Sequence, residues 1–120
     1  MKKLVTLYWY PKCSTCRDAK KWLESQGQVV ETIDMIQEVP SPELLAQWVQ
    51  ESGLPIRRFF NTSGVKYRAL GLKDKIDGYT LEEACQVLAT DGMLIKRPIL
   101  VKDGHFLVNG FKEKEYGGVL

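Results

Sequence analysis

The sequence predicts one α/β domain in which helices cover both faces of a mixed four-stranded sheet. Two observations support this. Runs of β-branched and aromatic residues alternate with amphipathic stretches, and a strand–helix–strand unit opens the chain while a hairpin and a helix close it. With 120 residues, 44% of them hydrophobic, the chain suffices for a single domain over residues 1–120 with a modest core.

The opening unit begins with a buried strand over Lys3 to Trp9, which stops before Pro11. A helix is expected from about Ser14 to Gln26, because its apolar residues recur on one side and Gly27 provides a natural stop. Residues 28–33 predict a second strand.

A helical insertion is expected over about residues 41–93. Ser41 and Pro42 mark a helix start. The serine hydroxyl can accept a hydrogen bond from the free N–H groups of the first turn. Proline is tolerated there because a backbone N–H at that position would have no partner within the helix. Thr80 and Glu83 form a second start, a capping box. Residues 54–78, which lie between these two helices, are expected to form short helices with a basic surface. The six basic residues of this segment are Arg57, Arg58, Lys66, Arg68, Lys73 and Lys75.

The closing half reads as two strands and a helix. The strands are expected at Ile99 to Val101 and Phe106 to Val108, joined by a turn at Asp103 and Gly104. A short helix near Lys112 to Tyr116 would end the domain.

The composition excludes several classes of protein. Seventeen basic and fifteen acidic residues leave a net charge of +2, which does not indicate a protein that binds its partners mainly through charge. The sequence contains no nucleic-acid-binding motif, so direct DNA binding is not expected. No stretch approaches the roughly 18 apolar residues of a membrane helix, so no membrane association is expected. Three cysteines are too few for a secreted disulfide scaffold, which favours a reducing, cytoplasmic location.

Cys13 and Cys16 form a C-x-x-C pair where the first strand passes into the first helix. At this junction Cys13 adjoins unpaired N–H groups and the positive end of the helix dipole, which stabilise a thiolate. Cys16 lies about one turn further on the same side of the helix, where a disulfide can form. We interpret Cys13 as a nucleophile and Cys16 as the resolving thiol that attacks the adduct on Cys13.

Two alternatives for the pair stay open, structural zinc and an inert buried pair. Zinc needs further ligands, and Cys85 and His105 have no metal-site spacing, so no metal is expected. Cys85 falls on an apolar helix stripe and is interpreted as a small buried hydrophobic residue, and His105 as a surface hairpin residue. Lys12 and Arg17 flank the pair, which argues against deep burial.

Arg97 and Pro98 precede the strand at Ile99 and allow two interpretations. Proline is tolerated at the first residue of a strand, so the dipeptide can simply mark a strand start. Alternatively, Pro98 presents its backbone beside the thiols while the permanently charged Arg97 holds a thiolate or an anionic substrate. The dipeptide alone favours neither.

Four motifs together resemble the arsenate reductase/Spx (ArsC-like) family of thioredoxin-fold proteins over essentially the whole chain. They are Tyr8 to Cys16 with its C-x-x-C, Leu70-Gly71-Leu72 after Tyr67, Leu94 to Ile99, and Gly110-Phe111. The resemblance implies a thioredoxin-like sheet with the helical insertion between its βαβ and ββα halves. It also implies a cis Pro98 packed against the Cys13 loop, and it favours the charge-holding role of Arg97.

Departures from the family pattern shape the expected activity. Glutaredoxin-linked arsenate reductases have one catalytic cysteine, with serine where this chain has Cys16, and three arginines around the oxyanion. Arg97 matches one arginine, whereas the other two positions fall on Asn61 and near Asn109-Gly110. Each charge-assisted contact contributes about 1.5–3 kcal/mol, so arsenate capture should be weaker by orders of magnitude.

The resemblance therefore implies a thiol-dependent oxidoreductase of the reductase-like branch, supplied with electrons by thioredoxin or by glutathione and glutaredoxin, with no bound cofactor. An Spx-type regulator is the alternative, in which the pair acts as a disulfide switch for binding the C-terminal domain of the RNA polymerase α subunit. The predicted catalytic residues are Cys13, Cys16 and Arg97. The predicted substrate-binding residues are Lys12, Ser14, Thr15, Asn61 and Pro98.

Overall fold

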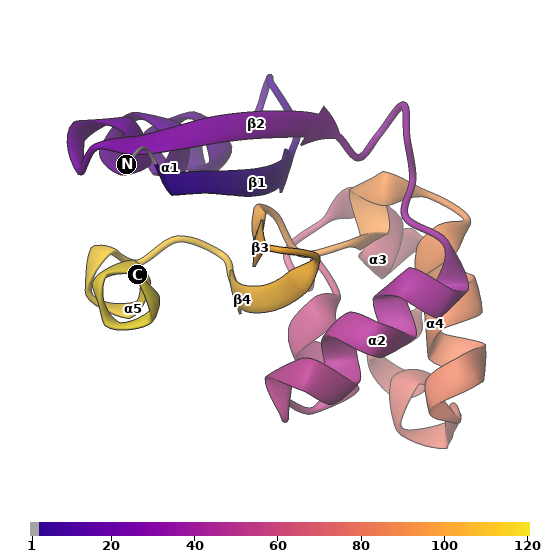
Figure 1. The fold of residues 1–120 in the computed structure, drawn as a ribbon. Helices are drawn as coiled ribbons and strands as arrows, with labels where there is room; N and C mark the ends of the chain where they lie inside the picture. The colour runs from indigo at the N-terminus through magenta and orange to yellow at the C-terminus, as the bar shows by residue number, and fades with distance from the viewer. Residues whose placement is uncertain (1–2) are drawn as a thin grey trace. The chain divides into compact units, whose positions relative to one another are not determined.

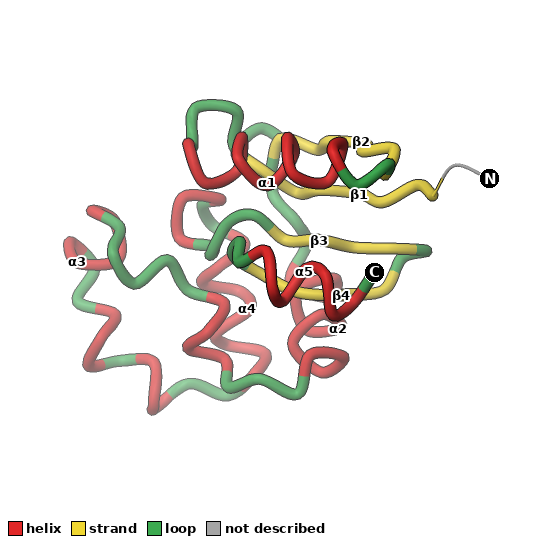
Figure 2. Tube along the Cα trace, turned by 90° about the vertical axis from the view of Figure 1, so that its left-hand side faces the viewer, coloured by secondary structure: helices red, strands yellow, loops and turns green. Residues whose placement is uncertain are grey.

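The computed structural model describes residues 3–120, which form two compact units (Figures 1 and 2). The first unit contains residues 3–35 and 97–120, and the second contains residues 36–96. The expected helical insertion thus lies in the second unit. Organisation as a single domain stays a prediction.

The first unit holds a four-stranded sheet with the strand order β2-β1-β3-β4 (Figure 1). Strand β1 (Lys3–Trp9) runs parallel to β2 (Gln28–Asp34) and antiparallel to β3 (Ile99–Lys102). Strand β4 (His105–Asn109) pairs antiparallel with β3. The predicted mixed four-stranded sheet is confirmed.

Helices α1 (Ser14–Ser25) and α5 (Glu113–Val119) follow the two halves of this sheet. They share one face of it, because residues of both helices belong to the same buried cluster as residues of β1 and β3. This cluster contains Val5, Leu7, Ala19, Leu23, Leu100 and Tyr116. The closing helix extends beyond the predicted Tyr116.

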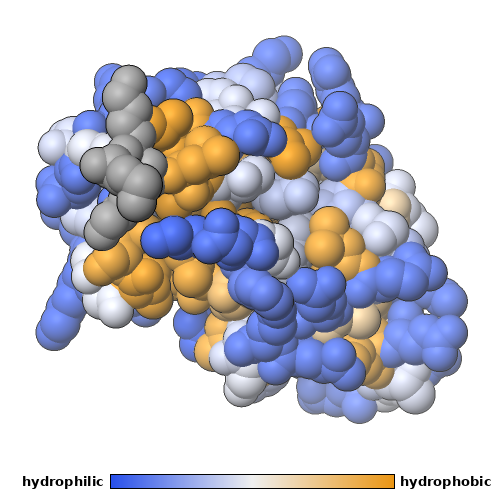
Figure 3. All heavy atoms as spheres, viewed as in Figure 1, coloured by the Kyte–Doolittle hydropathy of each residue, from blue (hydrophilic) through white to orange (hydrophobic). Residues whose placement is uncertain are grey.

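The β1 side chains alternate between this packed face and the opposite one. Val5 and Leu7 are buried, whereas Leu4 is 52% exposed and pairs in register with Val29, which is 39% exposed. Figure 3 shows apolar surface over β1 and β2. Leu4 and Val29 therefore lie on the face opposite the one that α1 and α5 occupy.

Tyr116 connects α5 to the rest of the first unit. Its buried hydroxyl donates to the Gly110 carbonyl at 2.7 Å. Its ring meets Phe111 edge-on at a centroid distance of 4.9 Å, and Trp22 of α1 edge-on at 6.0 Å. These edge-to-face contacts are a favoured aromatic geometry, so Tyr116 anchors the short final helix.

The second unit is helical, as the sequence predicts. The Ser41 hydroxyl accepts from the Leu44 N–H at the start of α2 (Pro42–Ser52), and Thr80 and Glu83 form the predicted capping box before α4 (Leu81–Ala89). Between α2 and α4 lie α3 (Val65–Ala69) and the 3₁₀ helices η1 (Ile56–Phe59), η2 (Leu72–Asp74) and η3 (Ile76–Gly78), and η4 (Gly92–Leu94) follows α4. Within residues 3–120, no helix has both the length and the apolar character needed to cross a bilayer.

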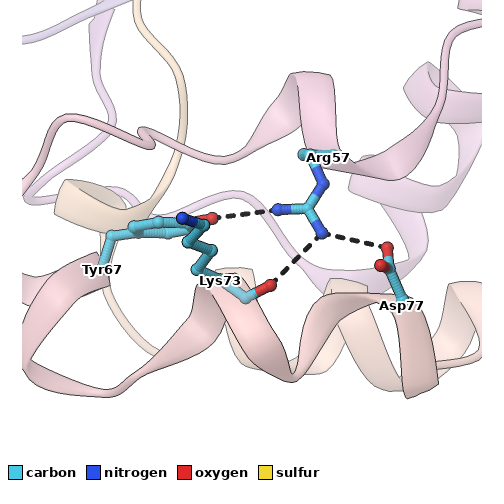
Figure 4. Close-up of polar contacts among 4 residues, drawn as sticks. All are labelled: Arg57, Tyr67, Lys73 and Asp77. Carbon is cyan, nitrogen blue, oxygen red and sulfur yellow. Dashed lines mark hydrogen bonds and ion pairs between the residues drawn. The ribbon is translucent and has the colours of Figure 1, made fainter.

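Arg57 joins the short helices of the second unit. Its guanidinium donates to the Tyr67 hydroxyl at 3.2 Å and to the Asp77 carboxylate at 3.0 Å (Figure 4). A longer bond of 3.4 Å reaches the Lys73 carbonyl. Arg57 therefore links η1 to α3, η2 and η3, so at least one of the six predicted surface cations serves the structure of the unit.

Candidate active site

Cys13 lies where β1 has ended and α1 begins. Its N–H donates to the Tyr10 carbonyl at 3.0 Å, and its own carbonyl accepts from the Arg17 N–H at 3.1 Å. With φ −90° and ψ 120°, Cys13 has the extended backbone of a helix N-cap. The sulfur is therefore held beside the first turn of α1, and the side chain stays partly exposed.

The Arg17 side chain fixes the loop before Cys13. Its guanidinium donates to the Pro11 carbonyl at 3.0 Å, although Arg17 belongs to the first turns of α1. The helix thus holds the loop that carries Cys13. In the sequence, Arg17 stood out only as a charge near the pair.

Cys16 is fully buried within α1, in contact with Cys13. Its backbone N–H and its thiol both donate to the Cys13 sulfur. The Tyr10 N–H in turn donates to the Cys16 sulfur. The structure therefore brings the two predicted thiols together, and both are free.

The pKa values of the two thiols shift in opposite directions. Burial is the largest influence on Cys13 and acts to raise its pKa, but the hydrogen bonds from Cys16 and the Arg97 guanidinium together outweigh it and lower the pKa. Burial raises the pKa of Cys16 to about 12, with a further contribution from the negative charge on Cys13. Cys13 thus ionises first while Cys16 keeps its proton.

Arg97 reaches the pair from the residue preceding Pro98 and β3. Its guanidinium donates to the Cys13 sulfur, and it lies over the Tyr10 ring at 5.6 Å from the ring centroid. The Arg97–Pro98 peptide bond is cis, as the resemblance implied, and the Pro98 carbonyl accepts from the Gly110 N–H at 2.8 Å. Of the two interpretations of the dipeptide, the one that places Arg97 beside a thiolate matches this geometry.

The remaining predicted substrate-binding residues have different surroundings. Lys12, Ser14 and Thr15 are exposed next to Cys13. Asn61 belongs to the second unit, where its N–H donates to the Leu94 carbonyl at 2.8 Å. Its side-chain amide donates to the Met93 carbonyl at 3.4 Å.

The other candidate ligands have the expected environments. Cys85 is buried on α4, and burial raises the pKa of its thiol, while His105 is exposed at the start of β4. Among the residues that the structure describes, no three His, Cys, Asp or Glu side chains are grouped so as to hold a metal ion.

Tyr10 belongs to the surroundings of the thiol pair but is not among the site residues that the sequence predicts. Its role depends on the antiparallel pairing of β1 with β3, in which Tyr8 lies opposite Ile99. The same register continued by two residues places Tyr10 opposite Arg97. Recognising this required the pairing of two strands that are far apart in the sequence.

Cys13 should be alkylated by iodoacetamide at a rate that rises with pH through a pKa below the ordinary thiol value of about 8.5. The thiolate is the reactive species, so lowering the pKa increases reactivity in the interval between the lowered and the ordinary value. Mass spectrometry of the modified peptide would assign the reaction. Alkylation of Cys13 only at the pH of an ordinary thiol would contradict this electrostatic account.

Comparison with known proteins identifies the family. The ArsC family profile matches residues 8–119. The chain is 50% identical over 112 residues to the uncharacterized protein YusI of Bacillus subtilis, covering 93% of this chain and 94% of YusI. It is 30% identical to the regulatory protein MgsR of the same organism, covering 96% of this chain and 89% of MgsR. The crystal structure of a possible arsenate reductase from Streptococcus mutans matches with a TM-score of 0.88 at 46% identity, covering 97% of this chain and 99% of that one. The predicted thioredoxin-like fold and the family resemblance are thereby confirmed, and this protein belongs to the ArsC family.

Proposed function

We propose that this protein is a cytoplasmic thiol–disulfide oxidoreductase in which Cys13 is the nucleophile, Cys16 the resolving thiol and Arg97 the residue that stabilises negative charge. The observation that carries the proposal is the opposite shift of the two contacting thiols. The pKa of Cys13 is lowered and that of Cys16 is raised to about 12. A pair of this kind holds an attacking thiolate and a protonated thiol at the same time.

The reaction consists of two exchanges. The Cys13 thiolate attacks one sulfur of a substrate disulfide, forms a mixed disulfide and expels the other sulfur as a thiolate, which takes a proton from water. Cys16 then gives up its proton to water and attacks the Cys13 sulfur, which releases the second substrate thiolate. Two electrons have passed to the substrate, and the Cys13–Cys16 disulfide is reduced again by thioredoxin or by glutathione with glutaredoxin.

The electrostatics of the pair give these exchanges an order. Burial is the main cause of the raised pKa of Cys16, and the negative charge on Cys13 contributes to it. When Cys13 becomes a neutral mixed disulfide, that contribution disappears and the pKa of Cys16 falls. Cys16 therefore becomes easier to ionise at the step that requires its attack.

The substrate would approach Cys13 from its exposed side. Lys12, Ser14 and Thr15 lie there and are proposed to contact the substrate. Pro98 is proposed as a further contact because of the family resemblance. Arsenate is not included as a substrate, because the family resemblance implies that two of the three arginine positions around the oxyanion fall on Asn61 and near Asn109-Gly110; turnover of arsenate with glutaredoxin should be negligible.

The Cys16→Ser variant should accumulate a mixed disulfide at Cys13. Without a resolving thiol, reaction with oxidised glutathione should stop after the first exchange, leaving one glutathione per chain on the Cys13 peptide by mass spectrometry. Cys85→Ser is the matched control, because Cys85 is buried on α4, and it should form the Cys13–Cys16 disulfide as the native protein does. Glutathione on Cys85, or on neither thiol, would argue against the assigned roles.

A second function is favoured by the relative MgsR, which is a regulatory protein and aligns over most of both chains. In this alternative the same thiol pair is a disulfide switch that controls binding to the C-terminal domain of the RNA polymerase α subunit. Pull-down with that domain under oxidising and reducing conditions separates the two functions. Binding that depends on the redox state supports regulation, and no binding in either state rules out this switch.

A further inference from the structure

Tyr10 lies between the end of β1 and Pro11, beside the thiol pair. Its ring is partly buried, and it is absent from the cluster that packs α1 and α5 onto the sheet. The ring faces the Arg97 guanidinium at 5.6 Å from the centroid. This distance is within the roughly 6 Å over which a cation is attracted to an aromatic face.

The backbone of Tyr10 contacts both cysteines. Its carbonyl accepts from the Cys13 N–H at 3.0 Å, and its N–H donates to the Cys16 sulfur. The backbone that carries the ring is thus part of the same turn that contacts both cysteines. The register of β1 with β3, in which Tyr8 pairs with Ile99, brings Arg97 across from this turn.

We infer that Tyr10 is a positioning residue for the proposed thiol reaction, whose ring keeps the Arg97 guanidinium at the Cys13 sulfur. Arg97 has a long side chain with many rotamers, and each contact in addition to the one with Cys13 narrows the locations that its guanidinium can take. A carboxylate could supply such a contact, but it would neutralise the guanidinium and weaken its attraction for the thiolate. The aromatic face attracts the cation without carrying a net charge, so the full positive charge remains available to Cys13.

This inference rests on the proposed function for its purpose, but its test needs no substrate. The Cys13 pKa is measured from thiolate ultraviolet absorbance against pH in the native protein, in Tyr10→Phe and in Tyr10→Leu. The first absorbance step belongs to Cys13, because the pKa of Cys16 is raised to about 12 and burial also raises that of Cys85. Tyr10→Phe keeps the ring and should keep the native pKa. Tyr10→Leu should raise the pKa by about half a unit to one unit.

Arg97→Gln separates positioning from a general structural role. If the ring acts through Arg97, adding Tyr10→Leu to Arg97→Gln should leave the Cys13 pKa of the single Arg97→Gln variant unchanged. An unchanged pKa in Tyr10→Leu would overturn the inference, as would an equal rise with and without Arg97. Neither of these results tests the proposed function, because both concern the Cys13 pKa and not turnover. Equal activity of the native protein and Cys13→Ser would refute the proposed function but would leave the pKa comparison of the Tyr10 and Arg97 variants valid.

Discussion

Replacing Cys13 with serine should reduce disulfide reduction to the uncatalysed background, a loss of more than about a thousandfold, as is typical when a nucleophile is removed. Burial acts to raise the pKa of Cys13, but the hydrogen bonds from Cys16 and the charge of Arg97 outweigh it and lower the pKa, which favours the thiolate. A serine hydroxyl at the same place stays protonated near neutral pH and is a weak nucleophile. The first exchange with the substrate therefore fails.

This loss can be measured as turnover of a glutathionylated peptide, with thioredoxin or glutathione as the electron donor. Cys85→Ser controls for the removal of a thiol elsewhere, since Cys85 is buried in the second unit, and it should retain the native rate. Near-native turnover by Cys13→Ser would remove the mechanism. Loss of turnover in Cys85→Ser would show that the third thiol has a role that the structure does not suggest.

Tyr116→Ala should lower the free energy of unfolding by about 3–5 kcal/mol, the range for truncating a large buried aromatic side chain. The variant loses the edge-on contacts with Phe111 and Trp22 and the hydrogen bond to the Gly110 carbonyl. Because native proteins are stable by only about 5–15 kcal/mol, this is a large fraction of the total. Denaturant unfolding followed by far-ultraviolet circular dichroism and fluorescence would measure it.

Tyr116→Phe separates the ring from the hydroxyl. It retains the aromatic contacts but leaves the Gly110 carbonyl without this donor, so it should cost about 1–3 kcal/mol. A loss below 1 kcal/mol for Tyr116→Ala would mean that α5 is not anchored through this residue.

Signals that act over a few residues predicted most of the secondary structure correctly. The Ser41 and Thr80 hydroxyls each accept from an N–H three residues ahead, so the sequence alone reveals both helix starts. The turn at Asp103 and Gly104 is equally local, with φ values of 53° and 80°. The exact ends of helices were less well predicted, as the extension of α5 beyond Tyr116 shows.

Contacts between distant segments could not be predicted in this way. The basic residues of 54–78 suggested only a charged surface, whereas Arg57 is bonded to Tyr67 and Asp77 of neighbouring helices. The packing of Tyr116 against Trp22 is of the same kind. Such contacts depend on how the elements pack, and a charged or aromatic residue in isolation does not specify its partner.

The thiol site also has one part that the sequence predicts and one part that depends on contacts between distant segments. The sequence by itself determined the Cys13–Cys16 pair and its place at a strand–helix junction, because one-turn spacing and the orientation of helix N–H groups are properties of a short segment. Only the tertiary structure decided that Arg97 reaches Cys13 and that the Tyr10 ring lies against it. The physical reason is the antiparallel pairing of β1 with β3, which places residues from opposite ends of the chain side by side.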